Sequence, residues 1–153
     1  GTVFEHRLRR TVTQMDNMLF SNLTLNPQPL HINVDFCEKE TEWGKPLMNS
    51  LFTLGLMIGM SVNDLTVGTT IANLGMQEVK FGHPVFEGDT IYSRSTVLDK
   101  RESKSRPNLG VVTVATEGFN QEAVVVCIFK RTLMVYKRGM APNRAPPVPG
   151  SKP

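Results

Sequence analysis

The segment of the chain with the strongest structural signal is residues 49–60, which read NSLFTLGLMIGM. Asn49 and Ser50 belong to the residue types that cap helix N-termini, and the residues after them are apolar on nearly every side of a helix. The apolar stretch is too short to cross a bilayer, so we expect a helix buried on most faces of a globular domain. Gly55 and Gly59 fall on one side of this helix, where they would let other backbone pack closely.

The sequence changes after this helix to long segments rich in β-branched residues. Four strands are expected there, at residues 69–81, 89–101, 110–120 and 122–137. Upstream of the apolar helix, a weak strand is expected at residues 2–9 and helices at residues 13–26 and 34–41. The short connections between the long strands favour antiparallel pairing. An antiparallel sheet wrapped around the apolar helix would enclose it, so the predicted class is α+β.

The helix expected at residues 13–26 carries its own start and stop signals. Thr13 caps it and Asp16 lies in its first turn, as in a capping box, and Pro27 ends it. The apolar residues between Met18 and Leu23 form a stripe. We expect this stripe to face the core.

Length and composition fit one globular domain at residues 1–138, followed by a tail at residues 139–153. The chain has 153 residues, of which 40% are hydrophobic and 20% charged, enough for one core. The tail carries half of the ten prolines and almost no apolar side chains. We therefore expect the tail to be disordered.

Charge and cysteine usage argue against several classes of protein. The net charge is +3, and aromatic residues do not interleave with the basic ones, so no nucleic-acid partner is expected. We see no secretory signal and expect no membrane association. Cys37 and Cys127 are far apart and lack metal-type neighbours, so we expect reduced thiols and no metal site. The expected compartment is the cytoplasm, with the mitochondrial matrix left open for a eukaryotic host.

Residues 26–31, which read NPQPLH, form a stiffened loop ahead of the apolar helix. Two prolines at alternate positions fix their own φ and restrict the residues before them. A histidine side chain can take or give a proton near neutral pH, so His31 could exchange a proton with a substrate. From the residues alone, a structural role is the plainer interpretation of a single histidine in such a loop.

This loop resembles the Asp-x-Asn-Pro-Leu-His signature of the MaoC-like, or enoyl-CoA hydratase 2, family. His31 falls on the histidine of the signature, Gln28 on its asparagine and Asn26 on its aspartate. The resemblance continues through residues 49–52 and 79–90 and covers roughly residues 10–137. It implies a hot-dog fold, an antiparallel sheet around a central helix.

The resemblance is strongest to the mesaconyl-CoA hydratase, or β-methylmalyl-CoA dehydratase, branch of the family. It implies reversible hydration of an enoyl-CoA thioester, with coenzyme A as part of the substrate and no other cofactor. His31 would deprotonate the water, and the backbone amide of Ser50, with that of Leu51, would stabilise the oxyanion. Gln28 and Asn49 would contribute to substrate binding.

Asn26 departs from the family pattern, because an amide cannot act as an acid near neutral pH. It could still orient the water by hydrogen bonding. Either His31 performs both proton transfers, or a nearby carboxylate, Asp16 or Asp35, replaces the missing aspartate. Helix capping by Asp16 and a surface turn at Asp35 are the plainer interpretations of these two residues.

Other polar and aromatic residues carry weaker expectations. Arg101, Lys104 and Arg106 could contact coenzyme A phosphates at a dimer edge, or they could form a solvated hairpin. His83 is expected to be structural, and His6 is assigned no role. Trp43 is expected in the core, with the mouth of the active site as the alternative.

Two alternatives to the hydratase stay open. Hot-dog domains also include thioesterases, which usually need a carboxylate that the loop lacks at Asn26. A non-catalytic acyl-CoA-binding homologue is the other alternative. A homodimer or higher homo-oligomer is expected, because a single open sheet leaves an edge strand exposed.

Overall fold

The computed structural model describes residues 1–142, and the predicted tail at residues 139–153 lies largely outside that part. The elements in order are β1 (Val3–Glu5), β2 (Arg10–Thr11), α1 (Gln14–Thr24), α2 (Pro29–Ile32), α3 (Val34–Glu40), α4 (Ser50–Leu65), β3 (Thr70–Phe81), β4 (Thr90–Glu102), β5 (Leu109–Phe119) and β6 (Val125–Tyr136). The four long strands match their predicted ranges to within three residues. The one-turn helix α2 was not predicted.

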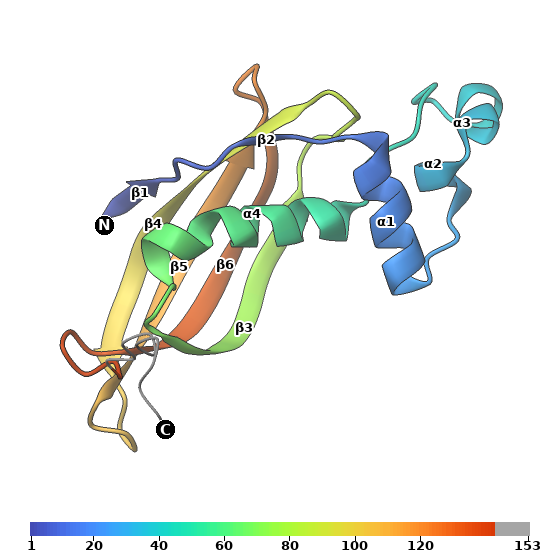
Figure 1. The fold of residues 1–153 in the computed structure, drawn as a ribbon. Coiled ribbons are helices and arrows are strands. Elements are labelled where there is room, and N and C mark those ends of the chain that lie inside the picture. The colour runs from blue at the N-terminus through green and yellow to red at the C-terminus, as the bar shows by residue number, and fades with distance from the viewer. Residues whose placement is uncertain (143–153) are drawn as a thin grey trace, which may run out of the picture.

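The strands form one antiparallel sheet in the order β1-β4-β5-β6-β3, and β2 also pairs with β4 (Figure 1). Consecutive strands β4, β5 and β6 are neighbours, as their short connections require. β3 follows α4 in the chain and pairs with β6, so it forms one edge of the sheet.

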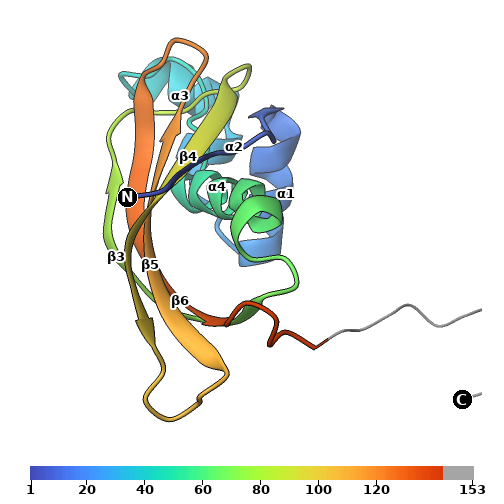
Figure 2. The ribbon, with the colours of Figure 1, turned by 90° about the vertical axis from the view of Figure 1, so that its left-hand side faces the viewer.

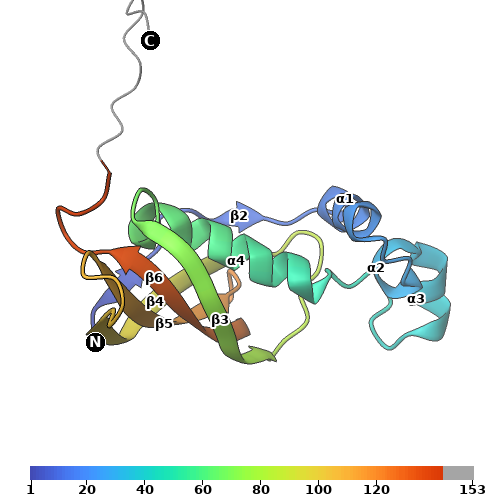
Figure 3. The same ribbon diagram turned by 90° about the horizontal axis from the view of Figure 1, so that it is seen from below.

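The sheet curves around α4, which lies against its inner face (Figures 2 and 3). Met57 and Met60 of α4 are buried there with Ile91 of β4 and Phe129 of β6. The long strands alternate between this inner face and the outer one, as a half-buried sheet requires. The predicted α+β hot-dog fold is confirmed.

The helix α4 is less enclosed than the sequence suggested. Leu51 is 60% exposed, and Gly55 and Gly59 are exposed as well. A Cβ atom built on either glycine would have no neighbour within 4 Å. The prediction that the two glycines admit close backbone is therefore wrong for the single chain, because they lie on the side of α4 that faces away from the sheet.

The orientation predicted for α1 is also wrong. Its buried residues are polar (Asp16, Asn17 and Ser21), whereas Leu19 is 54% and Leu23 83% exposed. The physical reason is that α1 packs against polar backbone near the start of α4. Asn17 hydrogen-bonds the main chain of both Leu47 and Asn49 there.

The N-terminal segment is tied to the core by His6, for which no role was predicted. The side chain of His6 is fully buried, with Nδ1 2.8 Å from Asp64 Oδ2 and Nε2 2.9 Å from Ser95 Oγ. Asp64 lies near the end of α4 and Ser95 on β4. His6 therefore joins three parts of the chain. No helix within residues 1–142 has the length and apolarity needed to cross a membrane.

Candidate active site

The Pro-rich loop is shaped by the way α1 ends. Leu25 takes a left-handed conformation with φ of 54°, and the Asn26 amide donates to the Ser21 carbonyl at 2.9 Å. The Asn26 side chain then turns back, its Oδ1 accepting from the Gln28 amide at 3.1 Å. This local turn leads directly into α2, with Gln28 as its N-cap and Pro29 in its first turn.

His31 lies in α2 and is half-buried. Its Nδ1 lies 2.7 Å from the carbonyl oxygen of Leu47. A carbonyl can only accept a hydrogen bond, so Nδ1 carries the proton of the neutral ring. The other nitrogen, Nε2, keeps its lone pair, and no described residue hydrogen-bonds it. A neutral imidazole in this tautomer is equipped to act as a general base.

The start of α4 provides a free backbone amide three residues after Leu47. Asn49 is 5% exposed, and its Oδ1 caps the helix by accepting from the Leu51 amide at 2.9 Å. The Leu51 amide is therefore occupied. The Ser50 amide has no acceptor among the described residues, and the positive end of the helix dipole lies there. Of the two amides suggested by the sequence, the one at Ser50 is thus available to an anionic oxygen.

A cavity of about 330 Å³ opens beside the Ser50 end of α4. Ser50 and Thr53 line it from the helix, residues 81–85 line it from the turn after β3, and Leu47 lines it as well. The His31 side chain is not part of the wall itself, but its Nδ1 contacts the Leu47 carbonyl. Leu47 and Ser50 are three residues apart, which is at most about 10 Å of chain. The candidate base and the free amide therefore border the same small region.

Aromatic and basic groups surround the cavity. Trp43 lines it, is 37% exposed, and packs on Phe86 with ring centroids 6.1 Å apart. The Lys45 ammonium lies 4.4 Å from the centre of the Phe86 ring. Trp43 thus borders the cavity and does not fill the core. His83, predicted to be structural, also lines the cavity and is exposed.

Neither carboxylate that could have replaced the family's aspartate is free to do so. Asp16 accepts from the Thr13 amide at 2.8 Å, as the capping box predicted, and pairs with Arg10. Asp35 has a 72% exposed side chain and pairs with Lys39 one turn along α3. Asp16 thus confirms its interpretation as a capping residue. Asp35 is at the surface as expected, but it lies in the helix α3 and not in a turn.

The basic residues proposed to contact phosphates lie at the other end of the sheet. Arg101 is the next-to-last residue of β4, and Lys104 and Arg106 lie in the connection between β4 and β5, at the far end of β4 (Figure 1). Along β4 they are about 35 Å from Thr90, which lies on the side of the sheet nearest α1. The chain does not bring them together with His31, so their contact with a phosphate stays a prediction that requires a second copy of the chain.

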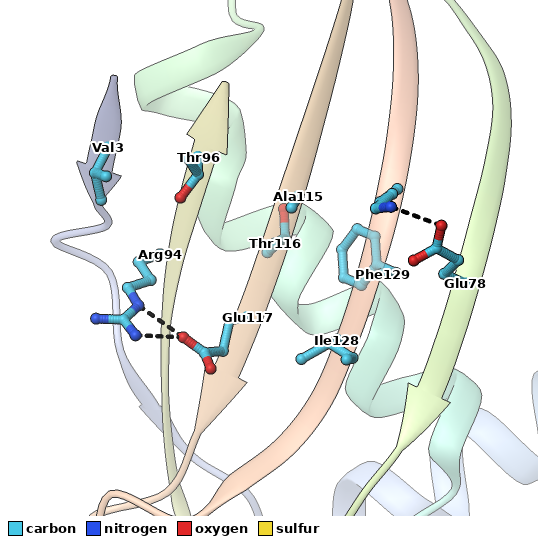
Figure 4. Close-up of a pocket in the computed structure, with 10 residues that line it drawn as sticks. Val3, Glu78, Arg94, Thr96, Ala115, Thr116, Glu117, Ile128 and Phe129 are labelled. Atoms are coloured by element: carbon cyan, nitrogen blue, oxygen red, sulfur yellow. Dashed lines mark hydrogen bonds and ion pairs between the residues drawn. The ribbon is translucent and has the colours of Figure 1, made fainter. Parts of the chain in front are cut away.

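A larger hollow of about 460 Å³ lies on the outer face of the sheet, opposite α4 (Figure 4). Its charged groups are already paired: Arg94 with Glu117 at 2.5 Å, and Lys130 with Glu78 at 2.6 Å. It contains neither His31 nor the start of α4. Its chemistry therefore does not match that of the candidate site.

Two residues that hold the candidate site in place were not predicted from the sequence. Asn17 is fully buried, and Gln14 donates from Nε2 to the His31 carbonyl at 2.9 Å. The only available signal was their spacing, because side chains three residues apart share one face of a helix. That signal is weak, since polar residues on a helix usually face solvent.

Comparison with known proteins places this geometry in a family. The sequence model of the MaoC like domain matches residues 1–118. A mesaconyl-CoA hydratase from Cereibacter sphaeroides is 33% identical over 150 residues, which are 97% of this chain and 43% of that protein. A β-methylmalyl-CoA dehydratase from Chloroflexus aurantiacus is 33% identical over 147 residues, 96% of this chain and 40% of that protein. This chain spans less than half the length of these curated relatives.

A solved structure gives the same result over most of the length of its chain. The X-ray structure of a monoamine oxidase regulatory protein from Archaeoglobus fulgidus superposes with a TM-score of 0.81 at 34% identity, covering 90% of each chain. The family match over most of the sequence and this likeness agree with the His31 loop and the free amide at the start of α4. The chain belongs to the MaoC-like dehydratase family.

Proposed function

We propose that this chain catalyses the reversible addition of water to an α,β-unsaturated acyl-CoA thioester. The observation that carries the proposal is the contact between His31 Nδ1 and the Leu47 carbonyl at 2.7 Å. It leaves Nε2 unprotonated beside the segment that leads to the free Ser50 amide. Base and oxyanion donor are the two groups that this reaction requires.

The proposed chemistry uses His31 for both proton transfers. Nε2 takes a proton from water as the water oxygen bonds to the β-carbon, and the electron pair of the double bond moves toward the thioester carbonyl. The Ser50 amide and the positive end of the α4 dipole stabilise the resulting enolate oxygen. Nε2–H then returns the proton to the α-carbon on the same face. The pairing of Asp16 with Arg10, and of Asp35 with Lys39, supports this assignment over a second carboxylate.

Asn26 and Gln28 have secondary parts in the proposal. Asn26 Oδ1 is engaged by the Gln28 amide, so the Asn26 NH₂ group is the part left to orient water. Asn49 contributes as the cap that holds the start of α4, and Leu51 as an exposed apolar contact there. We propose mesaconyl-CoA and β-methylmalyl-CoA as the substrate pair, on the strength of the relatives named above.

The test is incubation with mesaconyl-CoA and with crotonyl-CoA, followed by mass spectrometry and a free-thiol assay. We expect the gain of one water and no release of thiol. His31→Ala should lower the rate by about 100-fold or more, in line with the loss of a general base. Glu38→Ala, an exposed change on the neighbouring helix α3, is the matched control and should keep the rate.

The other outcomes contradict the proposal in different ways. Release of thiol would indicate a thioesterase, and no change in either acyl-CoA would indicate a binding homologue. A His31→Ala variant with a near-normal rate would refute the role of the imidazole. A thioesterase is disfavoured at present because no unpaired carboxylate lies among the residues lining the cavity at Ser50.

We also propose that two copies of the chain assemble through the β3 edge. β3 has a sheet neighbour on one side only, and Leu74 and Phe81 on it are 50% and 44% exposed. The curated relatives are more than twice as long as the matched segment, which leaves room in them for a second unit. In such an assembly, Arg101, Lys104 and Arg106 could approach a coenzyme A phosphate. The two free cysteines suit a reducing compartment such as the cytoplasm.

A further inference from the structure

Two side-chain amides of α1, Gln14 and Asn17, hydrogen-bond the chain segments around His31 and the start of α4. Asn17 has no exposed surface, and Gln14 lies one turn earlier on the same face of the helix. Burying an amide is costly unless each of its groups is hydrogen-bonded. The hydrogen-bond partners of Asn17 therefore explain why a polar residue occupies this buried position of α1, where an apolar residue would be usual.

Asn17 uses both ends of its amide on the segment that precedes α4. Its Oδ1 accepts from the Asn49 amide at 2.8 Å, and its Nδ2 donates to the Leu47 carbonyl at 3.0 Å. The same Leu47 carbonyl receives His31 Nδ1 at 2.7 Å. One buried side chain thus fixes both the acceptor that sets the His31 tautomer and the residue that caps α4.

Gln14 extends this contact to the backbone of α2. Its Nε2 donates to the His31 carbonyl at 2.9 Å, and its Oε1 lies 3.4 Å from Asn17 Nδ2. The histidine is consequently held at its ring through Leu47 and at its main chain through Gln14. Both attachments lead back to α1.

We propose that Asn17 is a positioning residue for hydration, acting through Leu47 and Asn49 on His31 and the Ser50 amide, with Gln14 as its support. The inference rests on the proposed function of the site. Among side chains of this size, only an amide combines one acceptor and one donor group in the required arrangement. Aspartate keeps the acceptor and loses the donor, and leucine loses both.

The charged groups of α1 and α3 next to α2 are paired or exposed, and Lys45 and Glu87 line a small hollow with Gln14. On α1, Asp16 is paired with Arg10. On α3, Asp35 is paired with Lys39, and the remaining charged residues there are exposed (Glu38 and Glu40). The Cys37 thiol is 3.4 Å from the Leu30 carbonyl, and burial raises its pKa, so it stays neutral. A new charge at Asn17 would therefore be the dominant change that His31 experiences.

The decisive variant is Asn17→Asp, which preserves shape and the bond to the Asn49 amide. A carboxylate facing the Leu47 carbonyl would repel it and favour the charged form of His31. We expect the His31 pKa to rise by about one unit and the acidic limb of the kcat/KM profile to move to higher pH accordingly. We expect kcat to fall by at least about tenfold, because misplacement by about 1 Å can cost up to about 100-fold, with little change in KM.

The matched control is Asn22→Asp, which adds the same charge at an exposed position of the same helix. It should leave the pH profile and kcat unchanged. Should Asn17→Asp fail to fold by circular dichroism, Gln14→Glu tests the same claim at a half-exposed position, with a smaller loss of about three- to tenfold in kcat. Thermal melting of each variant separates a positioning defect from loss of structure.

A second measurement keeps this inference distinct from the proposed function. Nitrogen-15 NMR of labelled histidine reports the tautomer and pKa of His31 in the absence of any substrate. The inference requires an Nδ1–H tautomer in the unaltered protein and a raised pKa in folded Asn17→Asp. An unchanged titration in that folded variant would overturn the inference, whereas absence of hydration by the unaltered protein would overturn only the proposed function.

Discussion

At the scale of single residues, the chemistry available to His31 follows from one carbonyl group. The Leu47 oxygen accepts from Nδ1, so the proton-free nitrogen is the one directed away from that contact. A neutral base results without any carboxylate partner. This accounts for how the site can work with an amide, Asn26, where the family signature has an aspartate.

The candidate site was predictable from sequence only where a local motif carried it. His31, Asn26 and Ser50 could be located because the signature loop and the helix cap are each continuous in the chain. Asn17 could not, because its partners, Leu47 and Asn49, lie 30 and 32 residues further along. A contact between residues so far apart in the chain is set by tertiary packing and produces no periodic pattern in the sequence.

Cys127 offers a prediction on pH and stability. Its side chain is completely buried in the core, and burial raises the pKa of its thiol to about 11. The unfolded thiol titrates near 8.5, so the unfolded state loses its proton first as the pH rises. Stability contributed by the neutral thiol is fully present below pH 8.5 and is lost between there and pH 11.

Urea unfolding at pH 7.5 and pH 10.5 measures this effect. The free energy of unfolding should fall by about 2 kcal/mol more in the unaltered protein than in Cys127→Ala, in which the group cannot ionise. Other titrating groups contribute equally to both proteins and cancel. Equal pH dependence of the two proteins would show that the thiol is not desolvated as the fold requires.

At the scale of elements, the sheet was predictable and the helix contacts were not. The long strands partly alternate apolar and polar residues, and turn residues follow them. The local sequence pattern therefore predicts their ranges. The orientation of α1 was not predicted, because its apolar residues between Met18 and Leu23 suggested a core face. The largely buried backbone at Leu47 and Asn49 needs hydrogen-bond partners, and Asn17 supplies them. α2 was not predicted because a one-turn helix is too short to show a periodic sequence pattern.

The contact between α4 and the sheet leads to a prediction at Gly118. A Cβ atom on this β5 residue would lie 2.4 Å from the Met57 sulfur, and Met57 is fully buried. Gly118→Ala should therefore lower the free energy of unfolding by about 1–3 kcal/mol, the usual cost of overpacking. Chemical denaturation provides the measurement.

Gly75 supplies the matched control for this substitution. It also lies in a strand, β3, but a Cβ atom there would have no neighbour within 4 Å. Gly75→Ala should be neutral or slightly stabilising. A similar loss of stability in both variants would show that strand glycine itself, and not contact with α4, is responsible.

At the scale of the whole molecule, exposed apolar surface gathers on parts that the single chain leaves uncovered. Leu23 and Leu25 at the end of α1 are 83% and 89% exposed, and Leu51 at the start of α4 is 60% exposed. The β3 edge is long and open on one side. Unpaired edges and apolar patches of this kind are normally covered in an assembly.

Sedimentation velocity at micromolar concentration tests the proposed assembly. We expect twice the mass of the chain, and we expect Leu74→Arg on β3 to shift the protein to monomer while it remains folded. Leu98→Arg is the control, because Leu98 is similarly exposed, at 48%, but lies on β4, away from that edge. A monomeric unaltered protein, or an equal effect of both substitutions, would contradict assembly through β3.

The most direct test of the account is a crystal structure with butyryl-CoA, a saturated thioester that can neither gain nor lose water. The thioester oxygen should lie within about 3 Å of the Ser50 amide nitrogen, with His31 Nε2 facing the β-carbon. A thioester bound elsewhere, or a His31 ring turned so that Nε2 contacts the Leu47 carbonyl, would contradict it.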